Sequence, residues 1–202
     1  EAITSKQSEI LKKLPIPPDF YLAGGTALAL QIGHRISVDF DFFTSKIIAS
    51  NLLPLLEKTF GAKGVEVVLN VSYQLTTRIG GVEVTYFSYP FPPMFPFVEY
   101  EKVKLLSIPE IAASKAHTIG RRAAWKDYID LYFILKEKHL KLQELIDIAQ
   151  KKYGEEFDAR LFLEQLLYSE DVPPAPITFL KEEPIRDGML TFFEQTIKQI
   201  KI

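Results

Sequence analysis

The spacing of hydrophobic and polar positions predicts mainly β-structure in the first half of the chain. Short runs rich in β-branched and aromatic residues, bounded by glycine or polar residues, are typical of strands. We expect strands at residues 20–23, 38–43, 64–70, 73–79, 82–89 and 102–106. Apolar residues three and four positions apart predict helices at residues 3–14, 27–33 and 45–61, the last kinked or restarted at Pro54. Four prolines between residues 90 and 98 predict an irregular crossing segment.

The second half of the chain has apolar positions at helical spacing almost to its end. They predict helices within residues 108–122, 125–138, 142–154 and 157–168, with a last helix near the C-terminus. A β-rich half followed by helices indicates an α+β protein, with a mixed β-sheet flanked by helices and a C-terminal helical part. We expect a core at residues 1–108 and a helical part at residues 109–202, packed on the core.

Composition narrows the classes of function. The chain has 24 Lys plus Arg against 26 Asp plus Glu, so no overall positive charge points to nucleic acid. The absence of cysteine excludes disulfides, thiolate metal sites and cysteine nucleophiles. No uncharged apolar run reaches the ~18 residues of a membrane span. We therefore expect a cytoplasmic protein with no membrane partner.

Two aspartates interrupt an otherwise apolar strand. In VDFDFF, side chains alternate between faces, so Asp39 and Asp41 share one face, about 7 Å apart, while Phe40 and Phe42 point to the core. Two neighbouring carboxylates repel each other unless a cation lies between them. Mg²⁺ is commonly bound by one or two carboxylates together with substrate phosphates. The alternative is an edge strand with two solvated acids.

A glycine pair lies between the preceding strand and its helix. At Gly24 and Gly25, small residues let backbone N–H groups and the helix N-terminus approach a phosphate, and Thr26 can cap the helix. A glycine pair is also common in ordinary turns. After the helix, His34 and Arg35 could touch phosphate, although loop residues are often simply exposed.

The joint arrangement resembles a known superfamily. An apolar strand, Gly-Gly, a short helix and then Asp-x-Asp is similar to the nucleotidyltransferases of the DNA polymerase β type. The segment GGTALALQIGHRISVDFDFF resembles the corresponding sequences of the AbiEii/AbiGii toxin-like branch of that superfamily. SIPEIAASKAHTIGRRAAWKDYIDLYFIL resembles the second signature of the same branch, and the two segments bracket residues 22–135.

The resemblance implies a nucleotidyltransferase fold and a site. The glycine turn, Gly24 to Thr26, would hold a nucleoside triphosphate, and Asp39 and Asp41 would hold Mg²⁺. Lys115 and Arg122 would bind the phosphates. The implied reaction moves a nucleotidyl group to an unknown acceptor, an RNA or a protein. A toxin role, with an antitoxin as partner, is implied by the resemblance alone.

Helical spacing leaves two interpretations of the basic residues. Lys115, Arg122 and Lys126 would share one face if a helix ran unbroken through Gly120. That face could meet a triphosphate. The alternative is a solvated basic stripe in which Lys126 pairs with Asp130, four residues on.

The sequence departs from this resemblance at the third carboxylate that such sites usually have. The aspartate expected from the resemblance aligns with Thr85, which carries no charge. Glu83, two residues earlier, shares the strand face of Thr85 and is our candidate third catalytic acid beside Asp39 and Asp41. The alternative is that Glu83 is only a solvated strand residue. Two other functions remain as alternatives to an active nucleotidyltransferase. One is a catalytically decayed nucleotide-binding or interaction protein of the same fold, and the other is a metal-dependent phosphodiesterase, which leaves the glycine turn unexplained.

Overall fold

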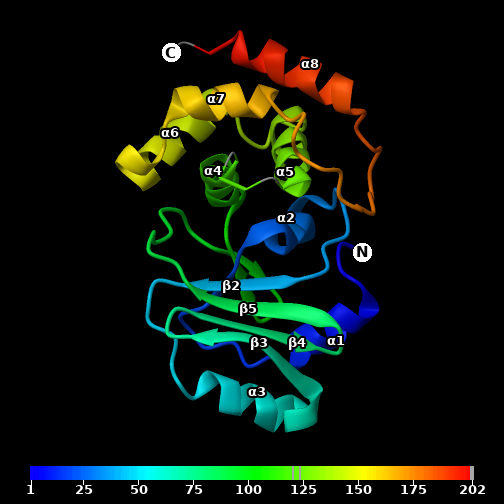
Figure 1. The fold of residues 1–202 in the computed structure, drawn as a ribbon, viewed down its shortest axis with the longest axis vertical. Helices are drawn as coiled ribbons and strands as arrows, with labels where there is room; N and C mark the ends of the chain where they lie inside the picture. The colour runs from blue at the N-terminus through cyan, green and yellow to red at the C-terminus, as the bar shows by residue number, and fades with distance from the viewer. Residues whose placement is uncertain (120, 123, 201–202) are drawn as a thin grey trace. The chain divides into compact units, whose positions relative to one another are not determined.

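The computed structural model describes residues 1–119, 121–122 and 124–200, in two units, Glu1–Leu106 and Ser107–Ile202 (Figure 1). The boundary expected from the sequence, after residue 108, lies close to this division. The expected packing of the helical part on the core stays a prediction. Within the described residues, no helix combines the length and the apolar character needed to cross a membrane.

The first unit contains three α-helices and seven strands within the described residues. The helices are α1 (Ser5–Lys13), α2 (Gly24–Ile32) and α3 (Leu52–Phe60), and a 3-10 turn, η1 (Ala62–Gly64), follows α3. The strands are β1 (Tyr21–Leu22), β2 (Phe40–Thr44), β3 (Val65–Val71), β4 (Gln74–Ile79), β5 (Val82–Ser88), β6 (Val98–Tyr100) and β7 (Val103–Leu105).

These strands form one mixed sheet, in the order β3-β4-β5-β2-β1-β7-β6. β2 is parallel to β5 and antiparallel to β1, and β1 is parallel to β7. Figure 1 shows β2 and β5 side by side, with β4 and β3 beyond them. The expected α+β class with a mixed sheet is confirmed. β4 and β5 form a hairpin that turns at Gly80 and Gly81.

Alternation along β2 separates the core from the opposite face. Phe40 and Phe42 are fully buried, and Phe42 stacks on Tyr86 of β5 with 5.3 Å between ring centroids. The Tyr86 hydroxyl donates to the carbonyl of Pro15 at 3.0 Å, and burial raises the pKa of this phenol far above its usual value. Asp41 lies on the other face and is half-buried. The expected division of β2 into a core face and an acidic face is therefore present.

The second unit is helical. Its elements are α4 (Ile108–Thr118), α5 (Trp125–Lys136), α6 (Leu142–Tyr153), η2 (Gly154–Glu156), α7 (Ala159–Leu167) and α8 (Arg186–Ile197). α4 packs against α5 and α6, and α7 packs against α8. Besides its apolar core, this unit contains a buried ion pair between Lys152 of α6 and Glu110 of α4. Charged side chains therefore help to join these helices.

Two expected boundaries in the first unit are wrong. The helix expected over residues 45–61, kinked or restarted at Pro54, begins only at Leu52, close to that restart. Pro54 lies in its first turn, where a missing N–H costs nothing. The segment expected to be irregular up to residue 98 ends in β6, which pairs with β7. Three-residue strands carry too little periodicity to be recognised in a proline-rich context.

The unbroken helix through Gly120 is also wrong. α4 ends at Thr118, where the N–H of Ile119 donates to the carbonyl of Lys115 at 2.9 Å, and α5 begins at Trp125. Gly120 itself lies outside the described residues. Lys115 and Arg122 therefore belong to different segments, and any shared role depends on contacts other than helical spacing.

Candidate functional site

The glycine turn joins β1 to α2 and is fastened to β2. The N–H of Ala23 donates to the carbonyl of Asp41 at 2.8 Å, and α2 begins at the next residue. Gly24 has φ +63°, a conformation that L-residues rarely adopt. A Cβ on Gly24 would lie 2.8 Å from Oδ2 of Asp41. The turn therefore requires glycine, and the Asp41 carboxylate lies directly against the first residue of α2.

The second glycine accommodates a buried cation. A Cβ on Gly25 would collide with the guanidinium of Arg35, whose side chain comes back from the α2–β2 connection. Arg35 is only 3% exposed, and its Nη1 donates to the carbonyl of Ile36 at 3.3 Å. His34 is fully buried as well. The sequence alternative of an exposed loop at these two residues is wrong, and the glycine pair leaves room for a carboxylate and a guanidinium.

The two candidate metal-binding acids are held in different ways. Asp41 lies within β2, where it pairs with Thr85 of β5 and its carbonyl accepts from the N–H of Ala23. Asp39 precedes the first residue of β2 and is half-buried. Its carboxylate has no hydrogen-bond or ion-pair partner among the described residues. Nor does that part of the chain contain a cluster of three or more His, Asp or Glu able to hold a metal ion.

Thr26, the third residue of the expected nucleotide turn, is buried at 2% exposure. Its Oγ1 lies 2.8 Å from Oγ of Ser37 and also hydrogen bonds with the carbonyl of Asp39. Thr26 does not cap α2, because the N-cap is Ala23. The hydroxyl is thus engaged within the fold, and only the backbone of this residue is left for a ligand.

Thr85 takes the sheet position beside Asp41, as the pairing of β2 and β5 shows. Its hydroxyl lies 3.2 Å from that of Thr76 on β4, and Gln74 donates to Thr76 at 2.9 Å. The neighbours of Asp41 in this direction are therefore neutral hydroxyls. They can support hydrogen bonds, but they add no negative charge for a cation.

Glu83 lies earlier in β5, with its side chain 41% exposed. It pairs with Arg78 of β4 at 3.5 Å, and Arg78 also contacts Glu66 of β3 at 3.1 Å. Phe40 of β2 pairs with Val84 of the parallel strand β5. The residues just before them, Asp39 and Glu83, therefore occupy neighbouring positions on these two segments. The strand register therefore places Glu83 beside Asp39, but the Glu83 carboxylate also forms an ion pair with the exposed Arg78.

Lys115 and Arg122 meet on one carboxylate in the second unit. Nζ of Lys115 lies 2.8 Å from Asp127 and 2.6 Å from Asp130, and its side chain is 7% exposed. Nε and Nη2 of Arg122 donate to Asp127 at 2.9 and 3.1 Å. The arginine side chain stays 62% exposed. Asp130, which one interpretation of the sequence paired with Lys126, is fully buried and pairs with Lys115.

The Lys115 ammonium keeps its positive charge although it is buried. Burial lowers the pKa of the Lys115 ammonium, but Asp127 and Asp130 outweigh that effect and hold the pKa above its usual value. Lys115 is therefore cationic at neutral pH. It neutralises two buried aspartates and fixes Asp127, which in turn holds Arg122.

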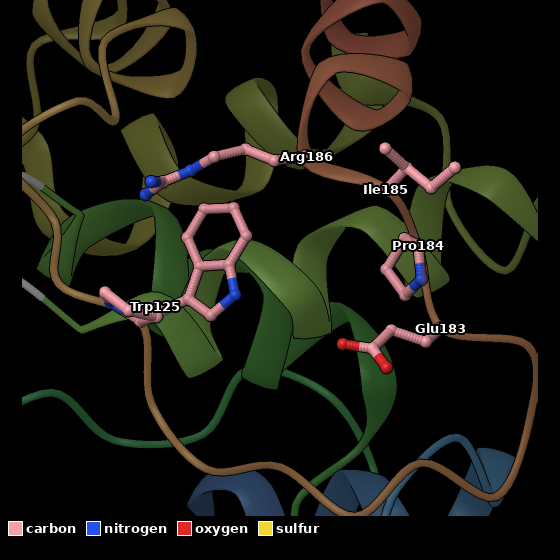
Figure 2. Close-up of a pocket in the computed structure, with 6 residues that line it drawn as sticks. Trp125, Glu183, Pro184, Ile185 and Arg186 are labelled. Carbon is pink, nitrogen blue, oxygen red and sulfur yellow. The ribbon is translucent and has the colours of Figure 1, made fainter.

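Trp125 lines a separate pocket of about 420 Å³ within the second unit (Figure 2). The guanidinium of Arg186 lies 4.3 Å from the centre of the Trp125 ring, and Tyr128 stacks on Trp125 at 5.7 Å. Figure 2 shows Glu183 and Pro184 on the other side of the opening. The indole is half-buried.

The first prediction concerns the room at Gly25. Gly25→Ala should lower the free energy of unfolding by about 1–3 kcal/mol, because the added methyl group displaces the buried Arg35 guanidinium. Gly188→Ala is the control, since a Cβ there meets nothing within 4 Å and should be neutral or stabilising by up to about 1 kcal/mol. Urea unfolding measures both. In an Arg35→Ala background the cost of Gly25→Ala should largely vanish; an unchanged cost would contradict this explanation.

The second prediction concerns the buried cluster. Lys115→Met should cost about 3–5 kcal/mol at pH 7, because it leaves two buried carboxylates without their ammonium. Lys151→Met, at an exposed position of α6, should change stability by less than about 0.5 kcal/mol.

The pH dependence follows from the raised pKa of Lys115. Its stabilising contribution is complete below the unfolded-state value of about 10.4 and is lost as the pH rises through the higher folded-state value. The difference between wild type and Lys115→Met should therefore be constant from neutral pH to about pH 10 and shrink above it. A small difference at pH 7 would show that the ion pairs contribute little.

The fold has relatives among solved structures. JHP933 from Helicobacter pylori aligns with a TM-score of 0.53 and 16% identity, over 98% of this chain and 96% of that one. The antibiotic-resistance factor ANT(2'')-Ia aligns with a TM-score of 0.52 and 13% identity, over 73% of this chain and 91% of that one. The expected nucleotidyltransferase fold is confirmed.

Sequence comparison gives the family. The uncharacterized protein aq_aa25 of Aquifex aeolicus is 31% identical over 98% of this chain and 97% of its own length. The family described as nucleotidyl transferase AbiEii toxin, type IV TA system, matches residues 9–199. The chain, with its acid-bearing strand placed against a glycine turn, belongs to the AbiEii nucleotidyltransferase toxin family of type IV toxin–antitoxin systems.

Proposed function

We propose that this protein binds a nucleoside triphosphate together with Mg²⁺ at Asp39 and Asp41 and transfers a nucleotidyl group to an acceptor. The observation that carries the proposal is the contact of the Asp41 carboxylate with Gly24. It brings an acid and the amino end of a helix to one place. A helix N-terminus attracts phosphate, and a carboxylate attracts the cation that accompanies it.

The residues present fit a divalent cation. Asp39 has no partner of its own among the described residues, and both acids are half-buried. Two carboxylates are too few to enclose a metal, but Mg²⁺ is typically held by one or two carboxylates plus the phosphates of the substrate. Bound there, Mg²⁺ would neutralise phosphate charge during the displacement. Without a nucleotide, we expect weak metal binding.

Residues of the protein would position the phosphates of the substrate. The first N–H groups of α2 have no intrahelical acceptor and can hold a phosphate oxygen. In the second unit, we assign phosphate contact to Arg122, whose guanidinium is largely exposed and suited to bidentate contacts. Lys115, whose ammonium already contacts two aspartates, would act by holding Asp127 in place. Catalysis would then rest on orientation and charge.

Membership of the family supports a proposal for the kind of acceptor and partner. ANT(2'')-Ia has been solved in complex with adenylyl-2''-tobramycin, a nucleotidylated small molecule. For this chain a toxin role favours a cellular macromolecule, an RNA or a protein, as acceptor and an antitoxin as partner. Incubation with each labelled triphosphate, Mg²⁺ and either total RNA or total protein would identify the donor and the acceptor.

The third prediction tests the site. Asp39→Asn and Asp41→Asn should each weaken Mg²⁺-dependent triphosphate binding at least about tenfold, or roughly 1.4 kcal/mol, because each removes a charge that holds the cation. Asp19→Asn, an exposed acid of the same unit, should bind like wild type. Calorimetry with and without Mg²⁺ measures the affinities. Unchanged metal-dependent affinity in both site variants would refute the assignment.

A second candidate function is nucleotide binding without turnover. It is favoured by the neutral pair of Thr85 and Thr76 beside Asp41 and by the pairing of Glu83 with Arg78. In that case the protein would keep the cation and phosphate contacts but lack a third acid to activate the attacking group. Transfer of label, rather than binding, distinguishes the two functions.

The fourth prediction separates these functions. If Glu83 is the third acid, Glu83→Gln should lower transfer by about a hundredfold or more and leave triphosphate binding intact. Glu66→Gln, which removes the other partner of Arg78, is the matched control. If the site has decayed, wild type should not transfer label, and Thr85→Asp should restore transfer. Strong wild-type transfer that is indifferent to Glu83→Gln would contradict the role of Glu83.

A further inference from the structure

We propose that Thr26 is a positioning residue for Asp39. Its hydroxyl, together with that of Ser37, fixes the main chain at Asp39 and so aims the carboxylate. This inference rests on the proposed function, because it takes Asp39 as a cation-binding acid. It assigns Thr26 a role different from the nucleotide contact that the sequence resemblance implies.

Asp39 needs a constraint that Asp41 does not. Asp41 is paired with Thr85 within the β2–β5 ladder, and its carbonyl accepts from Ala23. Asp39 lies before the first paired residue, Phe40, and no described residue forms a hydrogen bond or an ion pair with its carboxylate. The direction of the Asp39 side chain therefore depends on how its own main chain is held.

The Thr26 hydroxyl provides that hold. A carbonyl oxygen can only accept, so the proton of Thr26 goes to Asp39, and the hydroxyl of Ser37 must donate the proton between the two hydroxyls, 2.8 Å apart. This directed chain runs from Ser37 through Thr26 to Asp39. Both Thr26 and Ser37 are buried, so solvent does not compete for these bonds.

Ser37 is anchored from the other side by the N-terminal segment. Its N–H donates to the carbonyl of Ala2 at 2.9 Å, and its carbonyl accepts from Nε2 of Gln7 at 2.7 Å. Gln7 is itself fixed by a capping box with Thr4 at the start of α1. The hydroxyl chain therefore has a rigid origin, and loss of the Thr26 hydroxyl frees mainly its far end, at Asp39.

Thr26 also lies in the first turn of α2, two residues after Gly24. One side chain thus links the helix end that would meet phosphate to the acid that would meet the cation. Removing it should disturb the relative placement of Asp39 and α2 while leaving Asp41 in its ladder. A purely structural role would instead lower stability without changing the metal requirement.

The fifth prediction is a cycle of variants of the full chain. Thr26→Val, which keeps the shape and removes the hydroxyl, should raise the Mg²⁺ concentration needed for half-maximal triphosphate binding roughly tenfold to a hundredfold. Thr26→Ser should restore the wild-type value. Thr77→Val is the matched control, because it removes a buried threonine hydroxyl of β4 that bonds the carbonyl of Val84. Thermal unfolding of each variant shows that it is folded.

Combination with Asp39→Asn tests the route of the effect. If Thr26 acts through Asp39, the double variant should bind no more weakly than Asp39→Asn alone. Full additivity, or a wild-type Mg²⁺ requirement in Thr26→Val, would overturn the inference. If Thr26→Val does not fold, Ser37→Ala, which removes the donor to Thr26, takes its place in the cycle.

Amide hydrogen exchange separates this inference from the proposed function. Thr26→Val should speed exchange at residues 39–40 relative to wild type, and Thr26→Ser should not. If wild type shows no Mg²⁺-dependent triphosphate binding, the proposed function fails, and the exchange data still decide whether Thr26 holds Asp39. Unchanged exchange at these residues in Thr26→Val would refute the hold itself.

Discussion

The close approach of the Asp41 carboxylate to Gly24, which leaves no room for a Cβ on that glycine, determines how the acids, the turn and α2 lie relative to one another. Any side chain at Gly24 would push α2 away from β2 or turn the carboxylate aside. Because Ala23 also donates to the carbonyl of Asp41, the helix start is fixed to the strand through both main chain and side chain. The amino end of α2 and the acidic face of β2 are therefore parts of one rigid arrangement.

The two units treat negative charge differently. In the helical unit, Asp127 and Asp130 are buried and neutralised by Lys115, with Arg122 adding a second cation to Asp127. Buried carboxylates satisfied in this way hold structure together. Asp39, by contrast, has no described partner for its carboxylate and is half-buried. An acid held in place and left without a counter-charge is the more suitable one for an external cation.

The sequence carries the parts of the fold that depend on periodicity. Alternation identifies Phe40 and Phe42 as core, and the glycine pair marks the start of α2, because both signals are local. Pairing between distant residues leaves no such signal. Neither the ion pair of Lys152 with Glu110, 42 residues apart, nor the collision of a Gly25 side chain with Arg35 can be seen along the chain.

Helical spacing misleads at Lys115 and Arg122 for a related reason. A helix through Gly120 would place the two side chains on one face, yet they converge instead on Asp127 from two different segments. The convergence is set by the packing of α4 on α5. Likewise Thr26 is a residue type that often caps helices, but its hydroxyl forms a hydrogen bond with Ser37, which tertiary folding brings next to it. Tertiary contacts override local preference at both residues.

The order of strands in the sheet has a consequence for how the protein forms. β2 is flanked by β1 and by β5, and β1 is completed by a parallel pairing of Leu22 with Leu105. Parallel neighbours need long crossover connections, and closing long loops slows folding. During synthesis, the strand bearing the acids emerges early but has no complete sheet around it until Leu105 has left the ribosome. The acid-bearing strand itself has both of its neighbours, β1 and β5, only once Ser88 at the end of β5 has been synthesised.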